Sequence, residues 1–184
     1  MTKIIDTDTQ DVKSYVLDIC YQMNTDNWTP DYIVGIPRGG LLPAVMLSHY
    51  LNRPMVIQDV RLRDNVQQQS NPEIPLDALE GKQILIIDDI NDTGATFQWM
   101  VNDWENTIEP HLYGEAVHMP ALAYVHMPAE NKALWRRNIR FAVLIDNEGS
   151  EFKDVKYSAR SINKIEDPSW VVFPWECWWY YRNW

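Results

Sequence analysis

Two adjacent carboxylates, a third acid and a run of small and hydroxyl residues follow an apolar stretch near the middle of the chain. Residues 84–87 are all isoleucine or leucine, and they lead directly into Asp88, Asp89 and, two residues further on, Asp92. The apolar run predicts a buried parallel strand that ends in a tight loop, and residues from about 95 to about 109 predict a helix. Because ligands of open α/β sheets bind outside the carboxyl ends of the strands, we expect a binding site in this loop.

The two halves of the loop suit opposite charges. The paired carboxylates of Asp88 and Asp89 repel each other unless solvent, a cation or hydroxyl donors lie nearby, and ribose hydroxyls with a divalent metal meet that demand. The small residues 93–96 let backbone N–H groups and a helix N-terminus approach a phosphate. A ribose 5-phosphate carries both groups. Asp92 lies between the two halves, where the anomeric carbon and an incoming base would lie.

A second apolar segment ends in a glycine-rich turn that carries an arginine. Residues 32–36 predict a strand, and Pro37, Arg38, Gly39 and Gly40 follow it. Glycine allows unusual backbone dihedral angles, and a guanidinium beside exposed amides suits a pyrophosphate. An ordinary strand-to-helix turn explains the same glycines. The binding interpretation is favoured only because the acidic motif follows in the right order.

Residues 84–96 resemble the phosphoribosyl-pyrophosphate binding motif of type I phosphoribosyltransferases, and the chain looks most like the hypoxanthine/xanthine-guanine (purine) enzymes of that family. The resemblance implies an α/β fold, namely a parallel-sheet, Rossmann-like domain with a small C-terminal hood. It also implies Mg²⁺-dependent transfer of a 5-phosphoribosyl group from phosphoribosyl pyrophosphate to a purine-like base. The products would be a nucleoside monophosphate and pyrophosphate, as in purine salvage.

The resemblance also implies a role for each residue of the two loops. Asp92 would be the catalytic residue, which takes a proton from the base nitrogen or stabilises the ribosyl cation. Asp88 and Asp89 would hold Mg²⁺, directly or through water. The residues expected to bind phosphoribosyl pyrophosphate are Arg38, Gly39, Asp88, Asp89, Asp92, Thr93, Gly94, Ala95 and Thr96.

The nucleobase site is expected near the C-terminus, because residues 167–176 resemble the purine-site segment of the same enzymes. By that match Trp170 stacks on the base and Val171 contacts its edge. The family carries a lysine that donates to the purine 6-oxo group, but Met127 stands at that place, and a thioether donates no hydrogen bond. His126 could substitute, or it could be a strand histidine that faces solvent. The acceptor is therefore left open between an unusual purine, another nitrogen heterocycle and a poorly selected base.

The sequence also allows predictions for the rest of the aromatic C-terminal segment. Trp175 is expected to pack in the protein rather than to bind ligand, and Glu176 is a candidate for a second metal. Residues 177–184 are expected to pack on the domain or to form a subunit contact, because aromatic side chains are enriched at interfaces.

Residues 61–75 are polar and have no helical or strand period. The resemblance implies a long loop here that closes over the reacting centre and excludes water, with Arg61 and Arg63 approaching the pyrophosphate. A surface loop without a role is the alternative.

The composition describes a globular chain. It has 184 residues, 46% of them hydrophobic and 23% charged, which fits one domain with a sizeable core. The net charge of -10 opposes non-specific binding of nucleic acid. No apolar run approaches the roughly 20 residues that span a bilayer, the N-terminus lacks a signal-peptide pattern, and the two cysteines have no metal-ligand spacing. We therefore expect a cytoplasmic protein with no membrane or nucleic-acid partner, and a homodimer by analogy with the family.

Alternating elements must position these residues, and their alternation predicts a parallel sheet with right-handed crossovers. Helices are expected over about 9–24 and 41–51, strands over 32–36, 55–60, 115–126 and 139–145, and loop or short elements over 146–167. We expect one phosphoribosyltransferase domain over 1–184, with a core at about 10–145 and hood elements from about 146 to 184.

Two other functions remain open from the sequence. One is a regulator on the same fold that binds RNA or another protein, and the net negative charge weighs against RNA. The other is a non-catalytic protein that senses a nucleotide. Asp92 argues against such a sensor, whereas Met127 at the place of the expected lysine argues for it.

Overall fold

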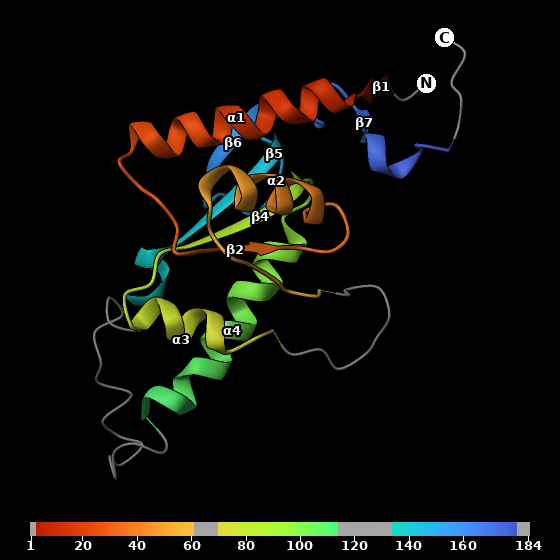
Figure 1. Cartoon of the computed structure of the whole chain (residues 1–184). Helices are drawn as coiled ribbons and strands as arrows, with labels where there is room; N and C mark the ends of the chain where they lie inside the picture. The colour runs from red at the N-terminus through yellow and green to blue at the C-terminus, as the bar shows by residue number, and fades with distance from the viewer. Residues whose placement is uncertain (1–2, 61–69, 114–133, 180–184) are drawn as a thin grey trace.

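The strands of the described residues form one large and one small parallel sheet (Figure 1). The computed structural model describes residues 3–60, 70–113 and 134–179 of the chain. The large sheet has the strand order β3-β2-β4-β5-β6, and every neighbouring pair in it is parallel. Its strands are β2 (Tyr32–Gly35), β3 (Met55–Ile57), β4 (Ile84–Asn91), β5 (Ile139–Asn147) and β6 (Val155–Ile162). The predicted α/β class with a parallel sheet is confirmed.

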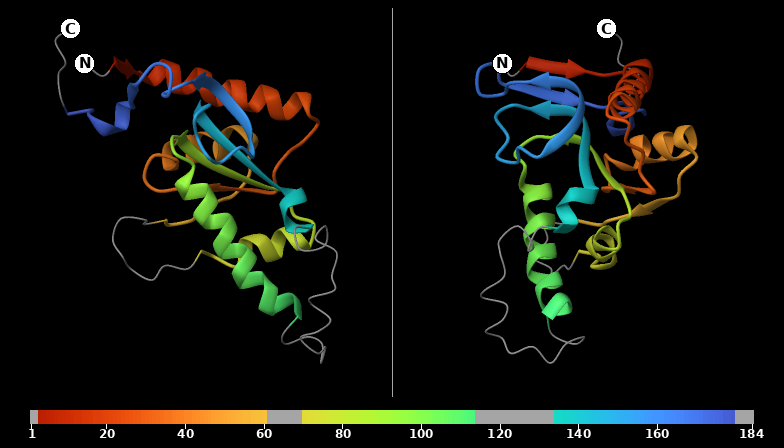
Figure 2. Two further views of the ribbon diagram at one scale, coloured as in Figure 1. Left: turned by 180° about the vertical axis from the view of Figure 1, so that it is seen from behind. Right: turned by 90° about the vertical axis from the view of Figure 1, so that its left-hand side faces the viewer.

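Helices cover both faces of the large sheet, as Figures 1 and 2 show. The helices are α1 (Thr9–Thr25), α2 (Leu41–Leu51), α3 (Glu73–Leu79) and α4 (Ala95–Tyr113), with short 3₁₀ turns η1 (Leu134–Asn138) and η2 (Pro174–Glu176). The side chains of β4 divide between two buried clusters: Leu85 and Ile87 pack with α1 and α2, and Ile84 and Ile86 pack with α3 and α4. A central parallel strand is buried on both faces, which explains why residues 84–87 are uniformly apolar rather than alternating.

Helix α1 begins where the sequence predicts. The side chain of Asp8 accepts hydrogen bonds from the backbone N–H groups of Gln10 and Asp11, and the Asp11 side chain accepts from the Asp8 backbone N–H at 2.9 Å. This capping box satisfies N–H groups that the first helical turn leaves without partners.

The prediction of a loop over 61–75 is wrong for its last residues, because α3 begins at Glu73. Ile74 and Ala78 lie four residues apart on one face of the helix and are buried against the sheet. Pro72 and Pro75 do not prevent this helix, because proline is tolerated at a helix start, where backbone N–H groups have no intrahelical partner. The loop candidates Arg61 and Arg63 lie outside the described residues.

The polar tract 146–167 contains an eight-residue strand that the sequence analysis missed. Strand β6 lies at the edge of the sheet and pairs with β5, with Ala142 opposite Tyr157. Tyr157 is the one fully buried residue of β6, and it packs on Trp28 with ring centroids 6.0 Å apart. An edge strand with one buried side chain carries too few apolar residues to show a strand period. The strand expected at 115–126 lies outside the described residues.

The small sheet joins the two ends of the described chain. Strand β1 (Lys3–Asp6) lies beside β7 (Ser169–Val172), as Figure 2 shows, and the two strands are parallel. Ile4 lies opposite Trp170 in this pairing. Thr7 extends this contact, because its backbone N–H and its hydroxyl each donate to the carbonyl of Val172 at 3.0 Å. The N-terminal strand, which the sequence analysis did not expect, thus supports the C-terminal hood. The domain limits set out above stay a prediction.

Among the described residues, no helix is both long enough and apolar enough to cross a membrane.

Candidate functional site

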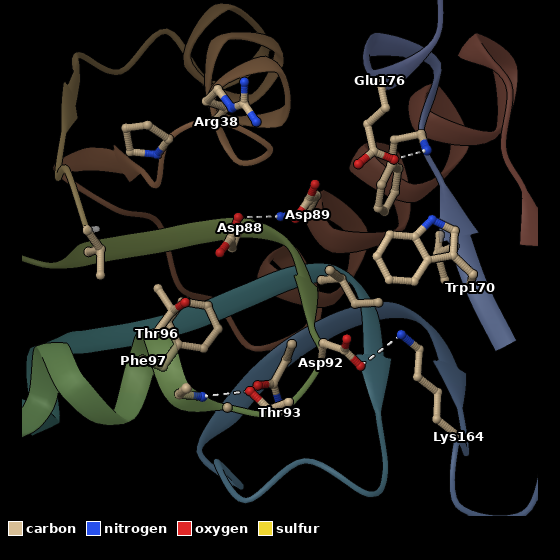
Figure 3. A pocket seen from close by; sticks show the side chains of 18 residues that line it. Arg38, Asp88, Asp89, Asp92, Thr93, Thr96, Phe97, Lys164, Trp170 and Glu176 are labelled. Atoms are coloured by element: carbon tan, nitrogen blue, oxygen red, sulfur yellow. Dashed lines mark hydrogen bonds and ion pairs between the residues drawn. The ribbon is translucent and has the colours of Figure 1, made fainter. Parts of the chain in front are cut away.

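A cavity of about 710 Å³ lies at the carboxyl end of β4. It opens there because the neighbours of β4 pair with it over different lengths. The pairing of β2 with β4 ends at Gly35 opposite Ile87, whereas β5 stays paired with β4 up to Asn91. The acidic residues therefore stand where β4 has lost its neighbour on one side. The turn after β2, the loop after β4, the turn between β6 and β7, and the hood line the cavity (Figure 3). This is the edge of the sheet at which ligands of parallel α/β folds bind.

The carboxylates of Asp88 and Asp89 form an unusual pair within β4, which continues three residues beyond Asp88 rather than ending before it. The Asp89 backbone N–H donates to Oδ1 of Asp88 at 2.9 Å. Burial, followed by the charge of Asp89, raises the pKa of Asp88 well above its ordinary value. Burial also raises the pKa of Asp89, to about 6, and the charge of Glu176 adds to the increase.

No lysine, arginine or histidine of the described chain forms an ion pair with Asp88 or Asp89. Two half-buried carboxylates that lie side by side and pair with no cation of the described chain fit a hard divalent ion such as Mg²⁺. The described residues provide no group of three or more His, Cys, Asp or Glu side chains that could hold a metal. The pair therefore fits an ion whose remaining ligands are water and substrate oxygens, which is how Mg²⁺ is usually bound beside phosphates.

The loop from Thr93 to Thr96 has the geometry of an anion site. Gly94 has a φ of 86°, and a Cβ there would overlap the backbone of Phe152, so the turn requires glycine. The 19-residue helix α4 starts at Ala95, and its N-terminus faces the cavity that all four loop residues line. The Thr93 hydroxyl accepts from the Ala95 N–H at 3.3 Å. Free N–H groups and the helix dipole favour a phosphate at this point.

The turn after β2 brings Arg38 and Gly39 to the opposite side of the acid pair. The peptide bond between Pro37 and Arg38 is cis. Arg38 is exposed and lines the cavity. Gly39 lies directly against Asp89, and a Cβ at Gly39 would overlap the carboxylate. The arginine and the acid pair, which are far apart in the sequence, thus belong to one site.

Lys164 is a residue of the site that the sequence analysis missed. Its Nζ lies 2.8 Å from Oδ1 of Asp92 and 5.9 Å from the centroid of the Trp170 ring. Figure 3 shows the side chains of Asp92 and Lys164 pointing toward each other beside this ring. A single lysine in a polar tract has no spacing or period that distinguishes it from a surface lysine. No sequence signal could have identified it.

The amide of Asn147 holds the backbones of both partners. Its Nδ2 donates to the carbonyl of Asp92 at 2.8 Å, and its Oδ1 accepts from the Lys164 N–H at 3.0 Å and from the Gly149 N–H at 3.2 Å. Asn147 is buried at the last position of β5. The sheet therefore sets the positions of Asp92 and Lys164 through one side chain.

The buried side-chain amide of Asn91 supports the loop of residues 93–96, which we call the anion loop. Asn91 donates to Oδ1 of Asp146 at 2.8 Å and to the carbonyl of Phe152 at 3.0 Å, and it accepts from the hydroxyl of Ser150 at 2.9 Å. The loop between β5 and β6 is thereby tied to the end of β4. The backbone N–H of Glu151 adds a bond to the carbonyl of Thr93 at 3.1 Å.

The hood places one aromatic ring at the cavity. Trp170 is 59% exposed, whereas its neighbour Val171 is buried, and both line the cavity. Trp175 stacks on Phe173 with centroids 4.8 Å apart and planes 4° apart, which confirms its expected packing role. Glu176 lines the cavity with one carboxylate oxygen bound to the Phe173 N–H at 2.9 Å. Its role in holding a second metal stays a prediction.

Two expectations for the C-terminal region have different outcomes. Trp178 and Trp179 are 79% and 55% exposed, so of the two alternatives expected for the aromatic tail, burial on the domain does not describe these two side chains. The subunit contact stays a prediction. Met127 and His126 lie outside the described residues, as does the end of the tail from residue 180 onward.

Comparisons with known proteins agree with this geometry. The family model described as the phosphoribosyl transferase domain matches residues 7–106. A purine phosphoribosyltransferase from Pyrococcus horikoshii is 21% identical, covers 95% of this chain and 94% of its own, and superposes with a TM-score of 0.62. The xanthine-guanine-hypoxanthine phosphoribosyltransferase of Helicobacter pylori is 14% identical over 95% and 94% of the two chains, with a TM-score of 0.60.

A third solved structure has a similar fold. It is described as a hypothetical protein from Neisseria gonorrhoeae with bound ppGpp, and it is 18% identical over 96% of this chain and 91% of its own, with a TM-score of 0.58. At these identities the structural likenesses establish the fold alone.

Proposed function

The chain belongs to the phosphoribosyl transferase domain family, and on that premise we propose that it transfers a 5-phosphoribosyl group from phosphoribosyl pyrophosphate to a purine-like base. The products are a nucleoside monophosphate and pyrophosphate, which is the chemistry of purine salvage. One observation carries the proposal: a single cavity is lined by the acid pair, the anion loop, Arg38 and an exposed tryptophan. A diol, a 5-phosphate, a pyrophosphate and a flat base are the groups that these four features suit.

The donor is held by residues of both loops. Thr93, Gly94, Ala95 and Thr96 bind the 5-phosphate through backbone N–H groups and hydroxyls. Asp88 and Asp89 would bind the ribose hydroxyls and would hold Mg²⁺, which would supply positive charge to offset that of the pyrophosphate.

The leaving group is stabilised by the turn after β2. Negative charge grows on the pyrophosphate as its bond to the ribose breaks, and Arg38 with the exposed backbone of Gly39 meets that charge. Arg61 and Arg63 are proposed to approach the same group when the preceding loop closes.

Asp92 acts at the reacting centre. Lys164 binds its Oδ1, which leaves Oδ2 to take a proton from the base nitrogen or to stabilise the ribosyl cation. Trp170 stacks on the base, and Val171 and Met127 are proposed to line the base site.

Further parts of the proposal rest on the resemblance and on composition. We propose a homodimer, and a cytoplasmic location because both cysteines, Cys20 and Cys177, are free thiols. The net charge of -10 supports a small-molecule substrate over a nucleic acid.

A non-catalytic nucleotide sensor is a second candidate function. It is favoured by the ion pair between Lys164 and Asp92, because a lysine that holds the catalytic carboxylate competes with proton transfer from a base. The structure of similar fold with bound ppGpp is a protein of this fold that holds a nucleotide.

The experiment that separates the two candidates measures pyrophosphate release. The protein is incubated with Mg²⁺, phosphoribosyl pyrophosphate and each member of a panel of nucleobases. A transferase releases pyrophosphate in a base-dependent way and forms the matching nucleotide. Binding of nucleotides without release for any base would favour the sensor and contradict the enzymatic proposal.

A further inference from the structure

We propose that Asn147 is a positioning residue for the reaction: its side-chain amide holds the backbone at Asp92 so that the Asp92 carboxylate lies at the reacting carbon of the ribose. The inference deepens the proposed function and rests on it for the role of Asp92. Asn147 is buried and does not line the cavity, so it acts through Asp92 and not by contact with a ligand.

The contact begins where the pairing of β4 with β5 ends. The last paired residues of these strands are Asn91 and Asp146. Asp92 follows directly after β4, and its backbone has left the ladder. Nδ2 of Asn147, the next residue along β5, donates to the Asp92 carbonyl at 2.8 Å. A side chain thus continues the attachment of β4 to β5 for one residue beyond the end of backbone pairing.

The three partners of this amide fix its orientation. A carbonyl only accepts, so that of Asp92 must face the NH₂ group of Asn147. The backbone N–H groups of Lys164 and Gly149 only donate, and they bond to Oδ1 at 3.0 and 3.2 Å. The reverse orientation would place donor against donor and acceptor against acceptor. Turning the amide away would leave buried polar groups unpaired, which is unfavourable, so the Asp92 backbone has a set position relative to the sheet.

The Asp92 carboxylate depends on this support because the cavity does not enclose it. Its side chain is 42% exposed, and Lys164 binds one of its oxygens (Figure 3). A carboxylate that takes a proton from the base or stabilises a ribosyl cation must lie close to the reacting atoms. A displacement of about 1 Å at a reacting centre lowers a rate by on the order of 100-fold. The position of the backbone that carries Asp92 therefore matters for turnover.

The anion loop has supports of its own. The backbone N–H of Glu151 donates to the Thr93 carbonyl at 3.1 Å, and the Asn91 amide ties the loop between β5 and β6 to the end of β4. Removal of the Asn147 amide should therefore shift Asp92 and leave the phosphate site in place. Binding of a phosphorylated sugar and the position of Asp92 can thus be measured separately.

A ligand with positive charge on the ribose ring tests the position of Asp92 without turnover. The probes are ribose 5-phosphate and its imino analogue, in which a protonated nitrogen replaces the ring oxygen, and calorimetry gives the affinity of each. We expect the wild type to prefer the cationic analogue about tenfold or more, as a charge-assisted contact implies. Asn147→Ala should lose most of this preference and keep its affinity for ribose 5-phosphate within about twofold. Its kcat should fall about tenfold or more, with KM for the donor little changed.

Matched variants exclude a purely structural role. Nδ2 of Asn138 donates to the Ala78 carbonyl at the same distance of 2.8 Å, just before β5 begins and at the opposite end of that strand from the cavity. Asn138→Ala should lower the midpoint of thermal unfolding and keep the preference for the cation. Asn147→Asp keeps the two acceptor contacts, but an ionised carboxylate at pH 8 donates no hydrogen bond, so this variant should behave like Asn147→Ala. Asn147→Ser replaces Asn147→Ala if thermal unfolding shows that the alanine variant does not fold.

A double-mutant cycle separates an effect through Asp92 from an effect through Lys164. If Asn147 acts through Asp92, the addition of Asn147→Ala to Asp92→Asn should lower kcat by less than about twofold more. Two effects that multiply would show that Asn147 acts on the reaction by another route.

Three results would overturn the inference: wild-type kcat and cation preference in Asn147→Ala, effects that multiply in the cycle, and the absence of a cation preference in the wild type. The pyrophosphate assay separates this failure from failure of the proposed function. Base-dependent pyrophosphate release by Asn147→Ala at the wild-type rate would keep the transferase and remove the role of Asn147. A cation preference that depends on Asn147, without turnover of any base, would keep the positioning role and remove the transferase.

Discussion

Gly39 lies against the carboxylate of Asp89 so closely that a side chain on Gly39 would overlap all three carboxylate atoms. The turn after β2 and the end of β4 are therefore one structural unit. Any group that occupies the position of a Gly39 Cβ displaces Asp89, and with it one half of the acid pair. This contact explains in physical terms why a glycine follows Arg38.

Gly39→Ala should weaken Mg²⁺-dependent binding of phosphoribosyl pyrophosphate by about tenfold or more, because the new methyl group moves the Asp89 carboxylate and a displacement of that size breaks a charge-assisted contact. Calorimetry with and without Mg²⁺ measures the change. Gly81→Ala is the control: its Cβ meets nothing within 4 Å, but its φ of 97° makes alanine strained. It should lower the free energy of unfolding by on the order of 1 kcal/mol and leave donor affinity unchanged. Equal donor affinity of Gly39→Ala and wild type would contradict the role of the contact.

Asp92→Asn should lower kcat by about 100-fold or more, because an amide takes no proton and carries no charge to stabilise a ribosyl cation. Donor binding should change little, since the acid pair and the anion loop are intact. Steady-state kinetics with the best base of the panel, together with donor affinity by calorimetry, provides the test. Unchanged turnover would remove Asp92 from the reacting centre.

Asp89→Asn should raise the midpoint of thermal unfolding at pH 7 to 8. Burial raises the pKa of Asp89 from 3.8 to about 6, the charge of Glu176 adds to the increase, and the hydrogen bond with Asp88 opposes it. Between those two values the folded state binds more protons than the unfolded state, so stability falls as pH rises through this window. The uncharged variant avoids this loss, and its advantage should disappear near pH 4.

The control is a variant at Asp26, for which the expected change in stability at pH 7 has the opposite sign to that of Asp89→Asn. Asp26 has a lowered pKa because the Lys156 ammonium bonds to it, with smaller effects of Tyr157 and Arg140. Its ionised form stabilises the folded state above pH 3.8, so Asp26→Asn should lower the unfolding midpoint at pH 7 and converge with the wild type in acid. A stability gain for Asp89→Asn that does not depend on pH would show that burial of the charged Asp89 carboxylate is not its cause.

Trp170→Ala should reduce nucleotide affinity by on the order of 1–3 kcal/mol, the range for loss of a base–aromatic stack, while ribose 5-phosphate binds as before. The ring is 59% exposed, so the stability of the variant should stay close to that of the wild type. Trp175→Ala, which removes a ring stacked on Phe173, should show the reverse pattern of lower stability and smaller loss of nucleotide affinity. Calorimetry and thermal unfolding on both variants distinguish ligand contact from packing.

Some expectations followed from local pattern, and these agree well with the structure. Helix α2 has the expected limits, α1 extends one residue further than expected, and α4 begins at the expected residue. The apolar periods of these segments report burial against a sheet, which is a property of neighbouring residues in the sequence. Strand β6 shows no apolar period of this kind, because its position at the edge of the sheet leaves it mostly polar.

The sequence by itself determined the strand–loop–helix motif from β4 into α4 and the family of the chain, since each depends on residues that are adjacent or nearly so. The tertiary structure alone decided that Lys164 binds Asp92, that Gly39 touches Asp89 and that β1 supports the hood. These contacts join residues distant in the chain, such as Asn147 and Asp92, which are 55 positions apart. The distances between such residues depend on where strand pairing stops and on how the loops turn. Neither feature produces a periodic pattern in the sequence.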